Sequence, residues 1–241
     1  MAQQEMAEVI EKEEKTKDKP HHLGHRQRLR QRLLQSPKGT LPDYEILEIL
    51  LFAASPRADM KPLAKSLLSH YGSLAKLFQA PTEELLEFKG VSEAAIAQFR
   101  VVQESVERVL RQEVLDSPIL QSWHALLDYC RASMGSLETE QFRIIFLNNK
   151  NRVIADELQG SGTVDHTPVY PREVVKRALT LNASAIILVH NHPSGNTTPS
   201  KADIQITHQI VQALDTVNIK VHDHVIIGAK SHYSFKSHGV I

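Results

Sequence analysis

Residues 184–203 read SAIILVHNHPSGNTTPSKAD and combine an apolar strand, a turn-rich loop and the start of a helix. The apolar run ends in two histidines, His190 and His192, with Asn191 between them. Successive side chains of a strand point to opposite faces, so both imidazoles are expected on one face and Asn191 on the other. The strand therefore presents two imidazole rings to one point.

The loop that follows predicts a third ligand at the same point. It returns the chain to a helix that begins at Ser200 and carries Asp203 in its first turn. Two His nitrogens and one Asp oxygen, with a fourth position left for water, are typical of a catalytic Zn²⁺ site. Ser200 and Asp203 also have the spacing of a capping box, which alone would explain them. Capping does not explain two histidines at the end of an apolar strand, so we expect zinc at His190, His192 and Asp203.

The flanking pattern alternates strands with helices. Residues 142–160 are two β-branched runs separated by an Asn/Lys turn, which predicts a hairpin, and residues 220–228 predict a closing strand. Helices are expected from Pro171 and from Ser200, and a further helix, capped by Ser122, places Cys130 on its apolar face as a core residue. This half is therefore predicted to be an α/β layer.

The N-terminal half is helical in pattern from Asp43 to about Val114, with Gly72 as a helix stop. Residues 85–102, LLEFKGVSEAAIAQFRVV, are similar to a helix-hairpin-helix element, whose turn at Lys89 and Gly90 can offer backbone N–H groups to a DNA phosphate. The second glycine of that pattern is replaced by serine here, and such elements are also used purely for packing.

A basic stretch precedes these helices and offers a second possible contact with DNA. It includes Arg26, Arg28, Arg30 and Arg32, the densest positive charge in the chain. The stretch is either an electrostatic footprint for DNA or a solvated helix face whose balancing acids lie elsewhere. If DNA is bound, weak and sequence-independent binding through the N-terminal half is expected.

Composition excludes several classes of protein. The chain has 241 residues with 28 Lys+Arg against 28 Asp+Glu, so strong nonspecific attraction of nucleic acid by the whole surface is not expected. One cysteine cannot form an internal disulfide, and the acidic start has no signal-peptide pattern, which favours the cytoplasm. The longest apolar run is far below the roughly 18 residues of a spanning helix, so no membrane contact is expected.

Three segments are expected: a disordered tail at 1–20, a helical domain at 21–116 and an α/β domain at 119–241, joined by a linker around Ser117 and Pro118.

The pattern His-x-His-Pro followed by Ser-x-x-Asp resembles the JAMM (MPN-domain) metalloprotease motif. The chain from 21 to 241, with the stretches HPSGNTTPS and DHVIIG, resembles the RadC family. The resemblance implies an α+β two-domain protein, with an all-α helix-hairpin-helix-like N-terminal domain and an α/β, cytidine-deaminase-like JAMM domain. It also implies zinc at the three residues above, a glutamate as general acid/base, and a serine beside the metal that stabilises the oxyanion, a role that Ser200 matches.

Glu140 is our choice for the glutamate, because it immediately precedes the first strand of the α/β half, as the JAMM glutamate precedes its strand. Glu173 is the rival, although an acid after Pro171 is expected at a helix start from the dipole alone. Glu138 and Glu157 lie near in sequence but lack this relation to the strand.

The implied activity is hydrolysis of an amide bond by a zinc-activated water, as in a peptidase or isopeptidase acting on an unidentified protein or peptide. Insertions that ubiquitin-cleaving JAMM enzymes carry have little room here, so ubiquitin is not predicted. A zinc deaminase would need a Pro-Cys-x-x-Cys segment, which one cysteine cannot supply.

The string His-Asn-His is taken as a coincidental likeness to HNH nucleases. Two further alternatives are a DNA-binding accessory protein of repair or recombination, and an inactive JAMM scaffold, against which the intact ligand set argues. Asp223 and His224 are left open, as a pair behind the metal or as strand filling. A second metal at His21, His22 and His25 is not expected.

Overall fold

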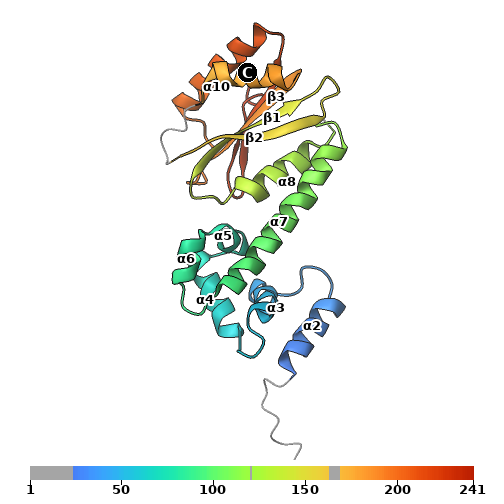
Figure 1. The fold of residues 1–241 in the computed structure, drawn as a ribbon, viewed down its shortest axis with the longest axis vertical. Coiled ribbons are helices and arrows are strands. Elements are labelled where there is room, and N and C mark those ends of the chain that lie inside the picture. The colour runs from blue at the N-terminus through green and yellow to red at the C-terminus, as the bar shows by residue number, and fades with distance from the viewer. Residues whose placement is uncertain (1–23, 120, 163–168) are drawn as a thin grey trace, which may run out of the picture. The chain divides into compact units, whose positions relative to one another are not determined.

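The computed structural model describes residues 24–119, 121–162 and 169–241 (Figure 1). These residues form two compact units: residues 24–77 with 81–99, and residues 78–80 with 100–241. The division falls inside one helix, α7 (Glu93–Asp116), and the linker predicted around Ser117 and Pro118 follows the end of that helix. The predicted disordered tail, residues 1–20, lies outside the described residues.

The first unit is helical, as the sequence predicted. Apolar side chains at helical spacing are fully buried between the helices, including Leu47, Leu67 and Phe99. The helix Lys61–Tyr71 ends at Gly72, as predicted, and the φ of 78° at Gly72 is a conformation that favours glycine. The helices of the first unit are α2 (His25–Gln35), α3 (Asp43–Ala54), α4 (Lys61–Tyr71), α5 (Leu74–Gln79) and α6 (Thr82–Glu87). The turns of α7 before Arg100 also belong to this unit, whereas the last residues of α5 belong to the second unit.

The second unit is built on the sheet that carries β1, β2 and β3 in Figure 1. The sheet has five strands in the order β2-β1-β3-β4-β5. β3 and β4 are parallel, and the other neighbours are antiparallel. The predicted hairpin is confirmed as β1 and β2, joined through a turn in which Asn151 has φ 56°. The strands are β1 (Glu140–Leu147), β2 (Val153–Gly162), β3 (Ala185–Asn191), β4 (Lys220–Ile227) and β5 (His232–Ser234).

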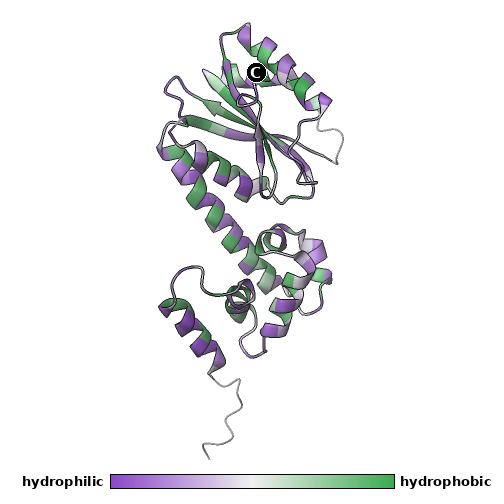
Figure 2. Cartoon of the chain, turned by 180° about the vertical axis from the view of Figure 1, so that it is seen from behind, coloured by the Kyte–Doolittle hydropathy of each residue, from purple (hydrophilic) through white to green (hydrophobic). Residues whose placement is uncertain are grey.

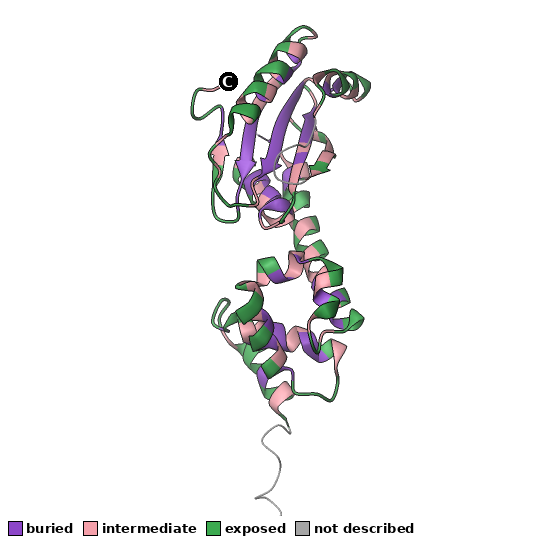
Figure 3. Cartoon of the chain, turned by 90° about the vertical axis from the view of Figure 1, so that its left-hand side faces the viewer, coloured by how far each residue is buried: buried purple, intermediate pink, exposed green. Residues whose placement is uncertain are grey.

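Helices cover both faces of this sheet and create two apolar clusters. On one face, Ile187 and Val189 pack with α8 (Trp123–Met134) and with Val114 of α7. On the other face, Ile186 and Leu188 pack with α9 (Pro171–Thr180) and α10 (Lys201–Asp215). β3 is therefore buried along its whole length and is apolar from Ala185 to Val189, and Figure 3 shows the buried centre of the sheet. Figure 2 shows the hydropathy of the same elements.

Cys130 lies in the first of these clusters with 1% of its surface exposed, which confirms the prediction of a core residue. Burial raises the pKa of its thiol to about 12, so the reactive thiolate is suppressed.

Two local predictions need correction. Ser122 precedes α8 but makes no side-chain capping bond, because its backbone (φ −113°, ψ 28°) lacks the extended conformation typical of an N-cap; its hydroxyl donates to the carbonyl of Pro118 (3.3 Å). The three-residue strand β5 was not predicted, since a run this short has no readable alternation. Among the described residues, no helix is both long enough and apolar enough to cross a membrane.

Candidate metal centre

The end of β3 presents its two histidines to one face of the sheet. Their Nε2 atoms lie 3.0 Å apart. The backbone N–H of His192 donates to Ile227 of β4 (3.0 Å), which continues the pairing past the end of the strand. Asn191 points to the opposite face, where its amide bonds the backbone of Gln141 (2.8 Å) and Thr139 (3.0 Å). The alternation expected from the sequence is therefore present.

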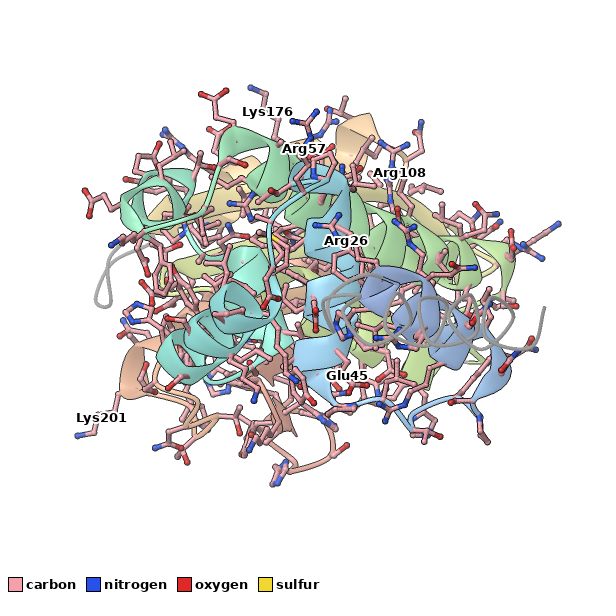
Figure 4. The ribbon with its side chains drawn as sticks, turned by 90° about the horizontal axis from the view of Figure 1, so that it is seen from below. Arg26, Glu45, Arg57, Arg108, Lys176 and Lys201 are labelled. Carbon is pink, nitrogen blue, oxygen red and sulfur yellow. The ribbon has the colours of Figure 1, made fainter. Side chains whose placement is uncertain are left out.

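The start of α10 brings Asp203 to the same point. Ser200 is the N-cap, and both bonds of a capping box are formed: Ser200 N–H donates to Asp203 Oδ2 (2.7 Å), and Asp203 N–H donates to Ser200 Oγ (3.1 Å). Lys201 projects outward into solvent (Figure 4). The capping interpretation and the ligand interpretation of Asp203 thus hold together, because one carboxylate both caps the helix and faces the histidines.

The three side chains have the spacing that zinc requires. Asp203 Oδ1 lies 3.4 Å from His190 Nε2, and Asp203 Oδ2 lies 3.5 Å from His192 Nε2. Zinc–ligand bonds of about 2.0–2.1 Å in a tetrahedron place neighbouring ligand atoms about 3.3–3.4 Å apart. The donor set and its spacing therefore fit a zinc ion, and within the described ranges this is the one group of three or more His, Cys, Asp or Glu side chains so arranged.

The carboxyl of Asp203 is held in the ionised form that binds a metal, whereas the same interaction favours the protonated form of His192. Burial opposes the ionisation of Asp203, but the hydrogen bonds with His190 and His192 hold the pKa of its carboxyl far below the usual range. The hydrogen bond with Asp203 raises the pKa of His192, while burial works against that shift. The carboxylate is thus present at neutral pH, as a metal ligand must be.

The outer nitrogen of each histidine also has a partner. His192 Nδ1 lies 2.7 Å from the carbonyl of Asn196. His190 Nδ1 lies 2.7 Å from His224 Nε2, and His224 Nδ1 lies 2.6 Å from Thr207 Oγ1. Such outer partners fix the orientation of metal-binding imidazoles. Thr207 was missed in the sequence, and His224, left open there, lies directly behind the candidate ligand His190.

Asp223 does not pair with the ring of His224, one of the two options left open. Its carboxylate accepts from the backbone of His224 (2.8 Å) and Lys236 (2.9 Å) and from Ser234 Oγ (2.5 Å). The Asp223 carboxylate therefore hydrogen-bonds the segment Ser234–Lys236 to β4.

Glu140 is the first residue of β1, and the register brings it to the candidate site. Phe142 pairs with His190 at the end of the antiparallel β1–β3 ladder, and the same register continued by two residues would bring Glu140 opposite His192. Opposed residues of an antiparallel pair share a face. In agreement, the negative charge of Glu140 contributes to the raised pKa of His192.

The other candidate glutamates have different surroundings. Glu173 is 51% exposed and pairs with Arg172 (3.3 Å) and Lys176 (3.9 Å) of its own helix. Glu157 forms a two-pronged ion pair with Arg177, and that bond lowers its pKa. Glu138 is exposed. Glu140 stays our choice for the acid/base.

The arginines proposed for DNA contact are partly used within the helical unit. Arg26, labelled in Figure 4, donates to the carbonyls of Ser55 (2.5 Å) and Ala58 (2.6 Å) after the end of α3. Arg32 donates to Glu45 (2.9 Å), also labelled there. The basic stretch thus has balancing partners, as the solvated-face interpretation expects. The guanidinium groups of Arg26 and Arg30 also lie over the ring of Phe52, 4.5 Å and 5.7 Å from its centroid.

The turn at Lys89 and Gly90 joins α6 to α7, and Gly90 has φ 95°. The exposed Glu93 in the first turn of α7 adds negative charge where a phosphate would dock. DNA binding through this turn and the arginines stays a prediction. His25 bonds Glu48 (2.8 Å), while His21 and His22 lie outside the described residues.

Comparison with known proteins covers both units. The model of the RadC-like JAB domain matches residues 120–240, and the UPF0758 N-terminal model matches residues 21–97. The UPF0758 protein of Ruegeria pomeroyi is 51% identical over 217 residues, 90% of this chain and 97% of its own length. The UPF0758 protein of Rhodobacter capsulatus is 52% identical over 213 residues, 88% of this chain and all of its own length. On these matches, the chain belongs to the RadC family of proteins with a JAB domain.

Proposed function

We propose that the protein is a zinc-dependent hydrolase of the JAMM type that cleaves an amide bond in a protein or peptide. The observation that carries the proposal is the convergence of His190, His192 and Asp203 at tetrahedral spacing. The charge of Glu140 acts on His192, which supports its assignment as the acid/base. The RadC-like JAB match over the same residues supports it. A zinc ion bound there would supply the Lewis acidity that lowers the pKa of water from about 15.7 towards 7.

Each nearby side chain then has a role that its position supports. Glu140, on the same face as His192, accepts the proton of the attacking water and returns it to the leaving amine. The oxygen of Ser200 accepts from the backbone of Asp203, which leaves the hydroxyl hydrogen to donate to the carbonyl oxygen as it becomes negative. Such a donor is worth on the order of 3 kcal/mol in the transition state.

The test has two parts, metal content and hydrolysis. Full-length protein freed of chelator should contain about one zinc per chain by elemental analysis, as a three-ligand catalytic site requires. Incubation of the zinc-loaded protein with a complex peptide mixture, followed by mass spectrometry of new termini, should detect cleavage. Glu140→Gln should keep zinc and lose cleavage by about 100-fold or more, since only the proton acceptor is removed.

Glu173→Gln is the matched control and should cleave like the wild type. If that variant were inactive instead, the glutamate would be misassigned while the zinc chemistry stood. A wild-type protein that takes up no zinc, even when zinc is added, would exclude the proposed function.

A further inference from the structure

A chain of buried hydrogen bonds lies behind the candidate ligands and has no part in the proposed hydrolysis. It runs from His190 Nδ1 to His224 Nε2 (2.7 Å), from His224 Nδ1 to Thr207 Oγ1 (2.6 Å), and from Thr207 Oγ1 to the carbonyl of Asp203 (2.5 Å). The chain begins at one candidate ligand and ends on the backbone of another. It therefore ties β3 to the first turns of α10 through β4.

The protons along this chain can be arranged in two ways when both imidazoles are neutral, because each ring carries one N–H and the hydroxyl carries one hydrogen. In the first order, His190 Nδ1–H donates to His224, His224 Nδ1–H donates to Thr207, and the hydroxyl donates to the Asp203 carbonyl. In the second order the donors are reversed, and the proton of His190 sits on Nε2. Only the first order leaves the Nε2 lone pair of His190 bare.

The contact at the end of the chain favours the first order. A backbone carbonyl can only accept, so a hydrogen on Thr207 Oγ1 must lie between the two oxygens to account for their 2.5 Å separation. In the second order that hydrogen turns towards His224 and leaves two oxygen atoms facing each other at this distance. The Asp203 carbonyl thus sets the direction of the whole chain.

Packing holds the two rings in place. Phe142 stacks on His190, with centroids 5.8 Å apart and planes 9° from parallel, and Phe235 stacks on His224 at 4.6 Å and 23°. His190, His224 and Thr207 have no exposed surface. Neither ring can rotate without displacing an aromatic neighbour, and bulk water does not reach the bonds between them.

We propose that His224 and Thr207 are positioning residues, which hold His190 in the tautomer whose Nε2 is free to bind the metal. The inference rests on the proposed zinc site. His192 needs no such device, since its Nδ1 faces the carbonyl of Asn196, which can only accept. The neighbour of His190 is another imidazole, which can donate or accept. The tautomer of His190 is therefore fixed by the Asp203 carbonyl, at the other end of the hydrogen-bond chain.

The first experiment compares two substitutions in the full-length protein. Thr207→Val keeps the branched shape and removes the hydroxyl, whereas Thr207→Ser keeps the hydroxyl. The zinc dissociation constant, measured by competition with a chromophoric chelator, should rise about 10- to 100-fold for Thr207→Val and stay near the wild-type value for Thr207→Ser. Equal affinity of Thr207→Val and the wild type would overturn the inference, as would equal losses in both variants.

The second experiment needs no variant and so does not depend on whether Thr207→Val folds. Long-range ¹H–¹⁵N correlation spectra of the zinc-loaded wild type report which ring nitrogen of each histidine carries a proton. We expect His190 and His224 both protonated at Nδ1. A proton on His224 Nε2 would overturn the inference while leaving the zinc site intact, and a wild type without zinc would instead remove the proposed function itself.

Discussion

Ser200 combines two roles that its sequence context offers as alternatives. Its oxygen caps α10 by accepting from Asp203 N–H, and its hydrogen stays available to a substrate carbonyl. The two roles use different atoms of one hydroxyl, so they do not compete. A residue without a hydroxyl cannot donate the Ser200 hydrogen bond to the substrate, whichever residue it is. Two such substitutions can still differ in how well they cap α10, and this difference appears in the free energy of unfolding.

Ser200→Ala and Ser200→Gly form the pair that separates these roles. Both remove the oxyanion donor, so both should lower hydrolysis by a similar factor of about 100. Urea unfolding should show a loss of about 1 kcal/mol for alanine and a few tenths for glycine, because glycine is a tolerable N-cap. Hydrolysis that followed stability, with glycine near the wild type, would assign Ser200 to capping alone.

His192 offers the most direct test of the ligand set. His192→Ala removes one of three protein ligands at the end of β3 and should abolish most zinc binding, measured by elemental analysis after dialysis. His222→Ala is the matched control. His222 bonds Asn151 (2.7 Å) and is not one of the three grouped ligands, so its loss should leave the zinc content unchanged. Retention of zinc by His192→Ala would remove His192 from the centre.

The sequence predicts part of this arrangement and not the rest. His190 and His192 follow from the alternation of a strand, and Asp203 follows from a short loop that returns to a helix start; these are local regularities. His224 and Thr207 belong with them only through the register of β3 against β4 and the seating of α10 on the sheet. Register between distant strands depends on tertiary packing, which no local pattern encodes.

At the scale of elements, an ion pair joins β1 to β2 on the face of the sheet opposite the histidines, and a tyrosine of α8 bonds the same carboxylate. Arg143 donates to Asp156 (2.8 Å), and Tyr129 donates to the same carboxylate oxygen (2.5 Å). The Asp156 side chain is 6% exposed. Burial raises the pKa of Tyr129 above its usual range, and the neighbouring carboxylate adds to the shift. The carboxylate is thus kept in the interior by its two donors.

Arg143→Leu should therefore destabilise the second unit by about 3–5 kcal/mol, because it leaves the carboxylate buried without its cation. The double variant Arg143→Leu with Asp156→Leu should recover most of this loss, since apolar pairs replace buried ion pairs at little cost. Urea unfolding measures both, and zinc content should stay unchanged because the pair lies on the other face. A loss below about 1 kcal/mol would mean that Asp156 is solvated.

Elements with strong periodicity were predicted well, and those whose ends depend on distant contacts were not. The helices from Asp43 onward and the β1–β2 hairpin are where the sequence places them. The exact end of α7 was not resolved from the sequence, because the signals at Asp116, Ser117 and Pro118 mark both a helix end and a linker. The helix runs to Asp116, and its second half belongs to the core of the α/β unit.

At the scale of the whole molecule, the net charge does not show which charged side chains are bonded within the fold. The chain carries 28 Lys+Arg and 28 Asp+Glu, and within the helical unit Arg32 pairs with Glu45 while Arg26 donates to carbonyls beyond α3. Two arginines of the densest basic stretch, Arg26 and Arg32, are thus bonded within the helical unit. A contiguous run of arginines in a sequence says how much charge is present and not how much of it faces a partner.

The division inside α7 gives the last prediction, which concerns the smallest fragment that folds. Val114 is 3% exposed and packs, with Leu110, against α8 and the sheet. A fragment of residues 119–241 loses both side chains, whereas one of residues 100–241 keeps them. Both retain the three candidate ligands and should bind zinc, but the shorter fragment should be less stable by at least about 1.5–3 kcal/mol, the value of burying one valine. Urea unfolding of the two metal-free fragments compares them, with zinc uptake as the control for a native site. Equal stabilities would mean that the second half of α7 contributes nothing to the core, and that the α/β domain begins at residue 119, as the sequence alone suggested.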